Sequence, residues 1–326
     1  MRIGQCTLRG APVAAVLFAL WACNRHQSAL APFGEDAAQI QTITLVMVVG
    51  AVVIAGGVAA LMIWAVRAPE GRIGLAGGER LIIIAGGIVP AVVLLALLMY
   101  SLPAMRPRAV ASGDLKVTVT GEQFWWRVRY EPTGSPALVT ANEIRVPVGR
   151  TVQFRLLGGD VVHSFWVPGL AGKMDMIPGR ENLLAVRATK AGVFRGQCTE
   201  LCGLSHALMA FDVVAMPPAA FDAWLAQQRT PAQLSTSAGR EQFAQQGCGG
   251  CHSIRGTEHA GTIGPDLSHF GQRRTLGAGT LAPTVANISS FIRHPERHKP
   301  GVRMPAFPHM TDAEARAIAQ FLRELR

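Results

Sequence analysis

A twelve-residue segment in the second half of the chain carries five groups that can bind a soft metal ion. They occur in the string Cys198-Thr199-Glu200-Leu201-Cys202-Gly203-Leu204-Ser205-His206-Ala207-Leu208-Met209. Thiolates, a thioether and an imidazole together form a ligand set typical of copper. A blue-copper site uses one Cys, whereas the two thiolates here could bridge two copper ions. The spacing therefore indicates a dinuclear copper centre.

A dinuclear site needs a further histidine from elsewhere in the chain. His163 supplies it, within Asp160–Pro168, which we expect to form a loop between strands. The alternatives are a disulfide between Cys198 and Cys202, or a zinc site that these thiols form with His206. Neither explains the whole Cys-x3-Cys-x3-His-x2-Met pattern together with a distant histidine, so dinuclear copper is favoured.

A second redox motif, Cys-Gly-Gly-Cys-His, contains Cys248, Cys251 and His252. It is the attachment signature of c-type haem, in which two thioether bonds fix the porphyrin and the histidine ligates the iron. A thioredoxin-like thiol pair is the alternative, but such a pair needs no trailing histidine. The sixth iron ligand should be a downstream methionine. Met304 is the candidate, because Met310 directly precedes a helix cap and is expected to pack.

Apolar residues gather near the start of the chain. The 326 residues are 49% hydrophobic with a mean hydropathy of +0.27, and the apolar ones concentrate before residue 106. Ile43–Trp64 and Leu81–Leu102 lie in uncharged stretches, and each is long enough for a transmembrane helix. The sequence therefore predicts a multidomain membrane protein with a two-helix hairpin over residues 37–106.

The charges predict the topology of this hairpin. Arg67, Arg72 and Arg80 lie between the two spans, and such an excess of Arg marks a cytoplasmic loop. The later domains should then lie on the periplasmic or outer side of a bacterial inner (plasma) membrane. The net charge of +10 does not indicate nucleic-acid binding, because Lys and Arg are scattered without a Lys/Arg-rich run.

Residues 1–23 have the pattern of an export leader. Arg2 and Arg9 form a basic start, and Gly10–Ala22 is apolar but too short to span a bilayer. The end of this stretch resembles a lipobox. A lipid anchor at Cys23 is therefore one expectation, and ordinary cleavage or a retained leader is the other.

Two domains of different class should follow the hairpin. Residues 107–216 contain short alternating segments punctuated by Gly and Pro, which predicts a β-sandwich. Residues 217–237 are expected to form a linker, with a short helix over Ala219–Gln228. Residues 238–326 are expected to be all-α, and a capping box at Thr311–Glu314 begins the last helix.

The hairpin, the sandwich and the copper string together resemble subunit II of the haem–copper oxidases, over about residues 37–216. The resemblance implies a cupredoxin-like domain that holds a CuA centre. The implied ligands are Cys198 and Cys202 as bridging thiolates, His163 and His206 as terminal imidazoles, Met209 as a weak ligand and Glu200 through its backbone carbonyl. The Glu200 side chain would reach a magnesium ion at the boundary with subunit I.

The final domain resembles a class I cytochrome c. Met304, within Pro300–Phe307, resembles the axial loop of small cytochromes c. The segment Gly264–Leu267 also resembles this family, in which the proline carbonyl accepts the proton of the proximal histidine. Pro265 would therefore orient His252. With the cytochrome fused to the copper domain, the chain resembles subunit II of the caa-type oxidases.

Phe124, Trp125 and Trp126 form an aromatic cluster and are candidates for electron transfer. Phe124 occupies the place where the family usually has a tryptophan that receives electrons from cytochrome c. The family often has a glutamate near the mouth of a proton path in the second helix. Here Ile83 occupies that place, and Glu79 lies one turn earlier.

The resemblance implies a relay. Electrons from an external donor, cytochrome c or a similar protein, would pass through haem c and CuA to subunit I. There oxygen is reduced to water with proton pumping, and subunit III is a further expected partner. Two alternatives stay open: a nitric oxide reductase with the same module, and a non-enzymatic membrane redox carrier. A positive cluster is expected near the exposed haem edge, consisting of Arg293, His294, Arg297, His298, Lys299 and Arg303.

Overall fold

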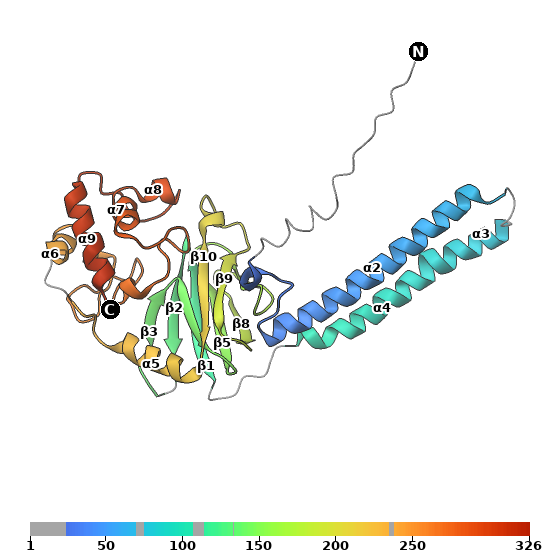
Figure 1. Ribbon diagram of the computed structural model, residues 1–326, viewed down its shortest axis with the longest axis horizontal. Helices are drawn as coiled ribbons and strands as arrows, with labels where there is room; N and C mark the ends of the chain where they lie inside the picture. The colour runs from blue at the N-terminus through green and yellow to red at the C-terminus, as the bar shows by residue number, and fades with distance from the viewer. Residues whose placement is uncertain (1–23, 70–74, 107–113, 133, 235–237) are drawn as a thin grey trace, which may run out of the picture.

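The computed structural model describes residues 24–69, 75–106, 114–132, 134–234 and 238–326. The predicted leader with Cys23 lies outside these residues, as does Arg72 of the predicted cytoplasmic loop. Figure 1 shows three parts along the long axis of the molecule: a helical hairpin at one end, a β-sandwich in the middle and a helical domain at the other end.

Two antiparallel helices form the hairpin. One is α2, Glu35–Arg67, and the other runs over Gly77–Met105; both are long and apolar enough to cross a membrane. The second helix comprises α3 (Leu75–Leu81), a π-helical segment η3 (Ile82–Ile88), α4 (Val89–Ser101) and a final 3-10 turn η4 (Leu102–Met105). At about 1.5 Å per residue, α2 is about 50 Å long, which exceeds the roughly 30 Å hydrocarbon core of a bilayer. The predicted hairpin is confirmed.

The sandwich consists, within residues 114–132 and 134–216, of two five-stranded sheets. The first has the order β3 (Leu138–Ala141), β2 (Trp125–Glu131), β1 (Leu115–Glu122), β5 (Thr151–Gly158) and β8 (Glu181–Arg187). The second has the order β4 (Glu143–Pro147), β10 (Ala210–Met216), β9 (Gly192–Cys198), β6 (His163–Trp166) and β7 (Met174–Met176). The pairs β1–β5 and β4–β10 are parallel. The predicted cupredoxin-like sandwich is confirmed.

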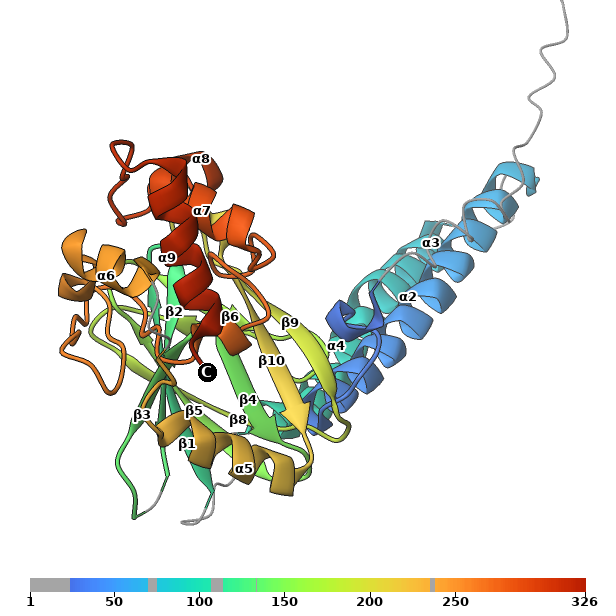
Figure 2. The ribbon, with the colours of Figure 1, turned by 60° about the vertical axis from the view of Figure 1, so that its left-hand side comes forward.

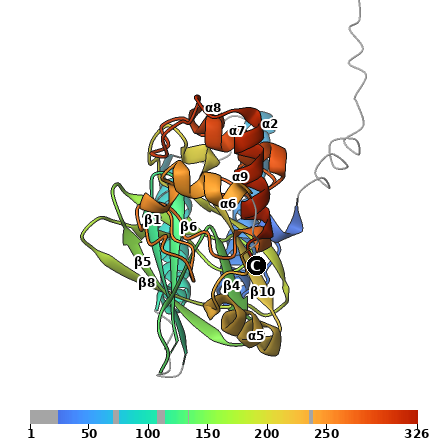
Figure 3. The same ribbon diagram turned by 90° about the vertical axis from the view of Figure 1, so that its left-hand side faces the viewer.

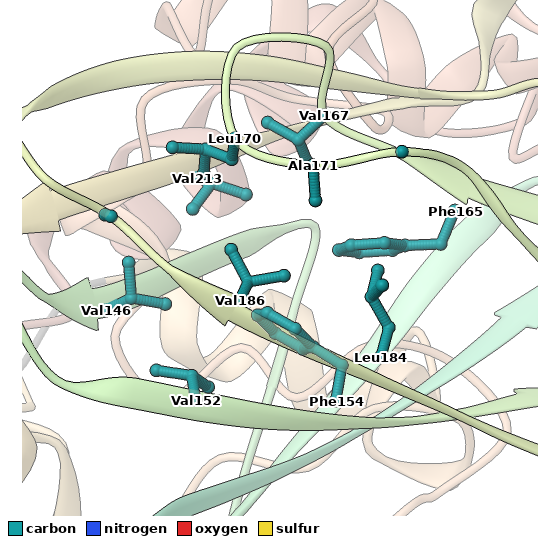
Figure 4. A pocket seen from close by; sticks show the side chains of 12 residues that line it. Val146, Val152, Phe154, Phe165, Val167, Leu170, Ala171, Leu184, Val186 and Val213 are labelled. Carbon is teal, nitrogen blue, oxygen red and sulfur yellow. The ribbon is translucent and has the colours of Figure 1, made fainter. Parts of the chain in front are cut away.

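Alternation along the strands builds the core between the sheets. In β5, Val152, Phe154 and Leu156 are buried, whereas the intervening Gln153 and Arg155 are more exposed. Figure 4 shows apolar side chains of both sheets around a void of about 10 Å³. A void of this size lined by apolar groups does not hold water. The core is therefore dry and close-packed, and it forms a firm support for the loops at its edge.

Strand β6 determines where the upstream histidine of the copper site lies. His163 was expected on a loop between strands, which is wrong, because it is the first residue of β6. Here it pairs with Met176 of β7, while Phe165 of β6 pairs with Cys198 of β9. Sheet pairing therefore holds this histidine beside the cysteine string.

The C-terminal domain is helical, as predicted. Its helices are α6 (Ala238–Gln245), α7 (Val285–Arg293), the single-turn α8 (Pro295–His298) and α9 (Asp312–Glu324). Thr311 and Glu314 form the predicted capping box at the start of α9. Helix α9 packs against α6 and α7 through buried Ile318 and Phe321, and Figure 3 shows these helices in front of the sandwich.

The segment between the two globular domains is packed rather than free. Helix α5, Pro218–Arg229, crosses the end of the sandwich (Figure 2), and its Phe221 and Trp224 belong to the sandwich core. Farther along, the Ala232 amide donates to the Arg255 carbonyl at 2.9 Å. The described part of residues 217–237, expected as a linker, therefore lies against both domains.

Candidate copper and haem sites

Two strand ends and one loop bring the predicted copper ligands together. His163 begins β6 and Cys198 ends β9, and these strands are neighbours in one sheet. The loop after Cys198 returns to β10 directly after Met209. The Cys198 amide donates to the Met209 carbonyl at 2.9 Å, which closes the loop at its base. All the predicted copper-binding residues thus lie at one end of the sandwich core.

Six potential donor atoms form a continuous cluster there. Cys198 Sγ lies 3.9 Å from Cys202 Sγ, 3.8 Å from His163 Nδ1 and 3.2 Å from the Glu200 carbonyl oxygen. Cys202 Sγ lies 3.6 Å from His206 Nδ1 and 3.8 Å from Met209 Sδ. A disulfide has a sulfur–sulfur bond of about 2.05 Å, so the two cysteines are not bonded to each other. A structural zinc site takes four ligands, and six donors fit two copper ions better.

The two thiols differ in acidity. The hydrogen bond between them lowers the pKa of Cys198 far below its usual value, and burial only partly opposes this effect. The same hydrogen bond, together with burial, raises the pKa of Cys202 well above its usual value. Cys202 is therefore the thiol that keeps its proton more strongly. Binding of metal to both sulfurs must release the remaining proton.

Asp160 orients the upstream histidine. Its Oδ1 atom lies 2.9 Å from His163 Nε2, which leaves Nδ1 directed at Cys198. Burial opposes a charge on His163, but its hydrogen bonds to Cys198 and Asp160 outweigh this effect and raise its pKa. The other oxygen, Oδ2, accepts from the Gln123 amide at 2.8 Å and from Arg303 at 3.0 Å. Such a carboxylate–histidine pair fixes the tautomer of a metal-binding imidazole.

Glu200 has two different environments. Its carbonyl oxygen belongs to the copper cluster, as given above. Its side chain is exposed, and Lys173 Nζ lies 3.1 Å from one carboxylate oxygen. Asp175 lies on the other side of the same lysine, at 3.9 Å. Two carboxylates and a lysine therefore lie close together at this surface.

The predicted haem residues surround one cavity of about 540 Å³. Its lining includes Cys248, Cys251, His252, Pro265 and Met304. A volume of this size lies within the usual range for cofactor sites, which is about 300–1,000 Å³. The structure therefore brings all five predicted haem residues together around a space that suits the cofactor. Met310, the competing methionine, is buried in the helical core.

The proximal histidine is prepared to bind iron. His252 Nδ1 lies 2.8 Å from the Pro265 carbonyl oxygen, so Nδ1 carries the proton and Nε2 keeps its lone pair. Burial lowers the pKa of His252, which keeps the ring neutral at physiological pH. A neutral imidazole is the form that ligates a metal.

The aromatic cluster lies between the two sites. Phe124 and Trp125 line the haem cavity, although they belong to the sandwich. Trp126, the next residue of β2, points to the opposite face and is fully buried, with its ring centre 6.3 Å from that of His163. Arg127 lies 4.7 Å above the Trp125 ring and also donates to the Thr262 carbonyl of the haem domain. Consecutive residues of one strand thus face the two centres.

The expected positive cluster is partly wrong. Lys299 is only 2% exposed, and its Nζ donates to carbonyls of both domains. Burial lowers its pKa to about 7. Arg303 pairs with Asp160 of the sandwich, as described above. Both residues line the haem cavity and lie at the contact between the domains, but only the Arg303 side chain is exposed as expected.

Comparison with known proteins gives two family matches. Residues 130–216 match the family of the cytochrome c oxidase subunit II periplasmic domain, and residues 236–326 match the cytochrome c family. The chain is 40% identical over 221 residues to cytochrome c oxidase subunit 2 of Alkalihalophilus pseudofirmus, covering 67% of this chain and 63% of the relative. It is 31% identical over 253 residues to the Bacillus subtilis protein of the same name, covering 73% and 70%.

One solved structure similar to part of the chain is the periplasmic domain of subunit II of cytochrome oxidase of Bradyrhizobium japonicum. The identity is 32%, the TM-score is 0.35, and the match covers 37% of this chain and 97% of that one. The matched region spans somewhat less than two thirds of the Alkalihalophilus protein and slightly more than two thirds of the Bacillus protein.

Proposed function

Because the chain belongs to the cytochrome c oxidase subunit 2 family, we propose that it is the subunit through which electrons enter a membrane-bound terminal oxidase. Haem c and dinuclear CuA would supply one-electron redox chemistry between an external donor, such as a cytochrome c, and subunit I. The reduction of oxygen to water and the coupled proton pumping belong to subunit I. Membership of this family favours the assignment over the two alternatives, a nitric oxide reductase subunit and a free redox carrier.

One observation carries the proposal: the haem cavity is built directly against the copper-bearing sandwich. Phe124 and Trp125 form part of its lining, and the next residue, Trp126, lies beside His163. The main chain therefore leads from the wall of the haem cavity to Trp126, and 6.3 Å between ring centres separates Trp126 from the proposed ligand His163. This arrangement supports electron transfer within one molecule.

The ligand roles follow from the two clusters. We assign Cys198 and Cys202 to bridge the copper ions, His163 and His206 to bind one ion each, and Met209 and the Glu200 carbonyl to complete the set. For the haem we assign Cys248 and Cys251 to the thioether bonds, and His252 and Met304 to the iron. The Pro265 carbonyl holds the proximal ring in place.

Further partners follow from the surface and the hairpin. The exposed Glu200 carboxylate would bind magnesium where subunit I covers the copper loop, and subunit III would complete the complex. Leu201, which is 81% exposed beside Glu200, gives this surface an apolar contact. Glu79 near the start of the second helix is proposed at the mouth of a proton path. The two globular domains would face the periplasm, with a possible lipid anchor at Cys23.

Metal content tests the assignment. Elemental analysis and a pyridine haemochrome assay of the purified complex should give two coppers and one haem c for each copy of the chain. One copper, or zinc in its place, would contradict the dinuclear reading. Protease added to intact spheroplasts should release the haem-bearing fragment, and protection of this fragment would reverse the orientation.

The relay is tested by kinetics. Flash reduction of the haem, followed at the copper absorbance over a dilution series, should give first-order transfer that does not depend on protein concentration. Reduction by an external donor should be second order. A transfer rate that falls in proportion to dilution would mean that the haem serves a neighbouring molecule.

A further inference from the structure

A short turn of the haem domain lies against the copper-ligand loop of the sandwich. The turn is Gly277–Thr280, and it runs beside Leu208–Ala210, which includes the proposed ligand Met209. The Ala210 amide donates to the Ala278 carbonyl at 2.9 Å. The Thr280 hydroxyl lies 3.2 Å from the Leu208 carbonyl. Two segments about 70 residues apart in the sequence are therefore joined next to the copper site.

The backbone of the turn has an uncommon conformation. Gly277, Ala278 and Gly279 have φ angles of 63°, 58° and 79° in succession. Alanine rarely adopts the left-handed region, so the surrounding contacts must hold it there. Ala278 is 1% exposed, and it packs within the hydrophobic core of the sandwich although it belongs to the haem domain. A tight approach to the sandwich explains why this turn keeps an unfavourable conformation.

Lys299 closes the same contact. Its Nζ donates to the Leu208 carbonyl at 2.9 Å and to the Gly277 carbonyl at 2.7 Å. Burying an amine is unfavourable unless it is hydrogen-bonded, and an apolar side chain of similar length would avoid this cost. A buried lysine here is therefore better explained by the two carbonyls that it joins than by stability alone.

The other end of the loop is held in the same way. Ser205, which is fully buried and directly precedes His206, donates to the Pro300 carbonyl at 2.6 Å. His206 lies on a single 3-10 turn, His206–Leu208, rather than on a strand. By contrast, His163 is held by sheet pairing. The haem domain contacts the half without strand support directly at the ligand loop, whereas it reaches the His163 half through Arg303 and Asp160.

We propose that Gly277–Thr280 and Lys299, together called the clamp, position the copper-ligand loop. The haem domain is then a structural part of the copper centre as well as its electron donor. The clamp residues act through Leu208 and Ala210 and do not themselves touch the metal. This inference rests on the proposed copper site, but its central contact can be measured without copper.

Hydrogen exchange of the full chain in its complex provides that measurement. Lys299→Met removes both hydrogen bonds and leaves an apolar side chain that is one atom shorter. In this variant the peptide covering residues 206–216 should exchange about tenfold faster, as expected for a lost hydrogen bond of a charged or strongly polar donor. In Thr280→Val, a change of similar shape, the increase should be smaller. Lys190→Met, at an exposed lysine of the same sandwich, is the control and should match the wild type.

Copper release to a chelator and the copper EPR hyperfine pattern provide the second readout. Lys299→Met should release copper about tenfold faster and alter the hyperfine pattern, while the haem content stays at one per chain. Unchanged exchange and unchanged release in both clamp variants would overturn the proposal. If the Lys299→Met protein does not accumulate in cells, the exchange and copper release of Thr280→Val decide the proposal. If exchange becomes faster in the clamp variants as expected but the chain binds no dinuclear copper, the proposed function is contradicted and the clamp is not.

Discussion

In the sandwich, the copper ligands come from two strand ends and one short loop, and their donor atoms already lie within 4 Å of one another along the cluster. In the helical domain, the haem residues line a cavity of about 540 Å³ that Phe124 and Trp125 of the sandwich help to enclose. The sandwich has a complete core between its sheets, with Phe154, Phe165 and Phe211 in contact. The core of the haem domain is instead arranged around that cavity.

The two domains therefore differ in whether the cofactor is needed before or after the domain has folded. The donor atoms of the copper site all lie on the sandwich, so metal can bind after that domain has folded. The haem domain has few elements between Gln245 and Val285, apart from 3-10 turns at Cys248–Gly250 and Phe270–Gln272. The haem would supply much of the apolar surface that these loops cover. We therefore expect the two domains to respond differently to loss of their cofactors.

The largest expected effect is the loss of haem attachment. Cys248→Ala/Cys251→Ala would leave the cavity without its bound group. Much of the lining of this cavity of about 540 Å³ is apolar, and its contact with haem would be lost to water. Limited proteolysis should then degrade the haem domain and spare the sandwich. Cys198→Ala/Cys202→Ala is the matched control, and it should abolish copper binding while both domains stay resistant.

The next effect concerns Trp126, which faces the sandwich core. Trp126 is fully buried and contacts Phe165 and Phe211. Trp126→Ala should cost about 3–5 kcal/mol of unfolding free energy, as for other large aromatic truncations in cores. Denaturant unfolding followed by sandwich fluorescence measures it. A loss below about 1 kcal/mol would show that the core closes around the missing ring.

Trp125, on the opposite face of the same strand, gives the contrasting prediction. It is partly exposed and lines the haem cavity. Trp125→Ala should slow haem-to-copper transfer, because it removes aromatic contact between the two sites, while both optical spectra and the sandwich stability change little. Flash reduction measures the rate. An unchanged rate would mean that Trp125 contributes packing alone.

Asp160 tests the connection between the two regions. It holds His163 on one side and Arg303 of the haem domain on the other. Asp160→Asn keeps the shape but weakens both contacts, and copper affinity should fall about 10–100-fold, as for other partners of metal-binding histidines. Competition with a chelator measures it. Arg303→Gln, which removes only the haem-domain partner, should have a much smaller effect on copper affinity.

Most of each ligand set could be predicted from sequence because it is local, although His163 and Met304 lie far from these two strings. The copper string from Cys198 to Met209 lies on one loop, and the haem motif spans five residues. Strand β2 could also have been predicted, because Trp126, Val128 and Tyr130 are buried at a period of two. Strands β6 and β7 have only four and three residues, so tertiary pairing rather than local pattern defines them.

The contacts between the domains could not be predicted in this way. Lys299 contacts Leu208, which lies 91 residues earlier, and Arg303 contacts Asp160, which lies 143 residues earlier. In the sequence, both residues appear within a run of basic side chains that is typical of a solvated surface. Only the folded arrangement distinguishes a buried hydrogen-bonded lysine from an exposed one. The same limit applies to Asp160, whose only signal was a carboxylate three residues before a histidine.

A pH dependence is also expected, because Lys299 lies buried at the contact between the domains. Burial lowers the pKa of Lys299 to about 7 in the folded protein, whereas an unfolded lysine titrates near 10.5. Between these values the unfolded state binds more protons than the folded state, so Lys299 should increase the unfolding free energy as pH rises from about 7 to about 10. Below pH 7 the amine is protonated in both states, and its contribution becomes constant. The slope cannot exceed about 1.4 kcal/mol per pH unit for one proton.

Urea unfolding of the wild type and of Lys299→Met at several pH values measures this slope, because the difference between the two proteins cancels the other titrating groups. A difference that does not change between pH 7 and 9 would mean that the buried amine keeps its charge, and the contact would then depend on a charged donor to the Leu208 and Gly277 carbonyls.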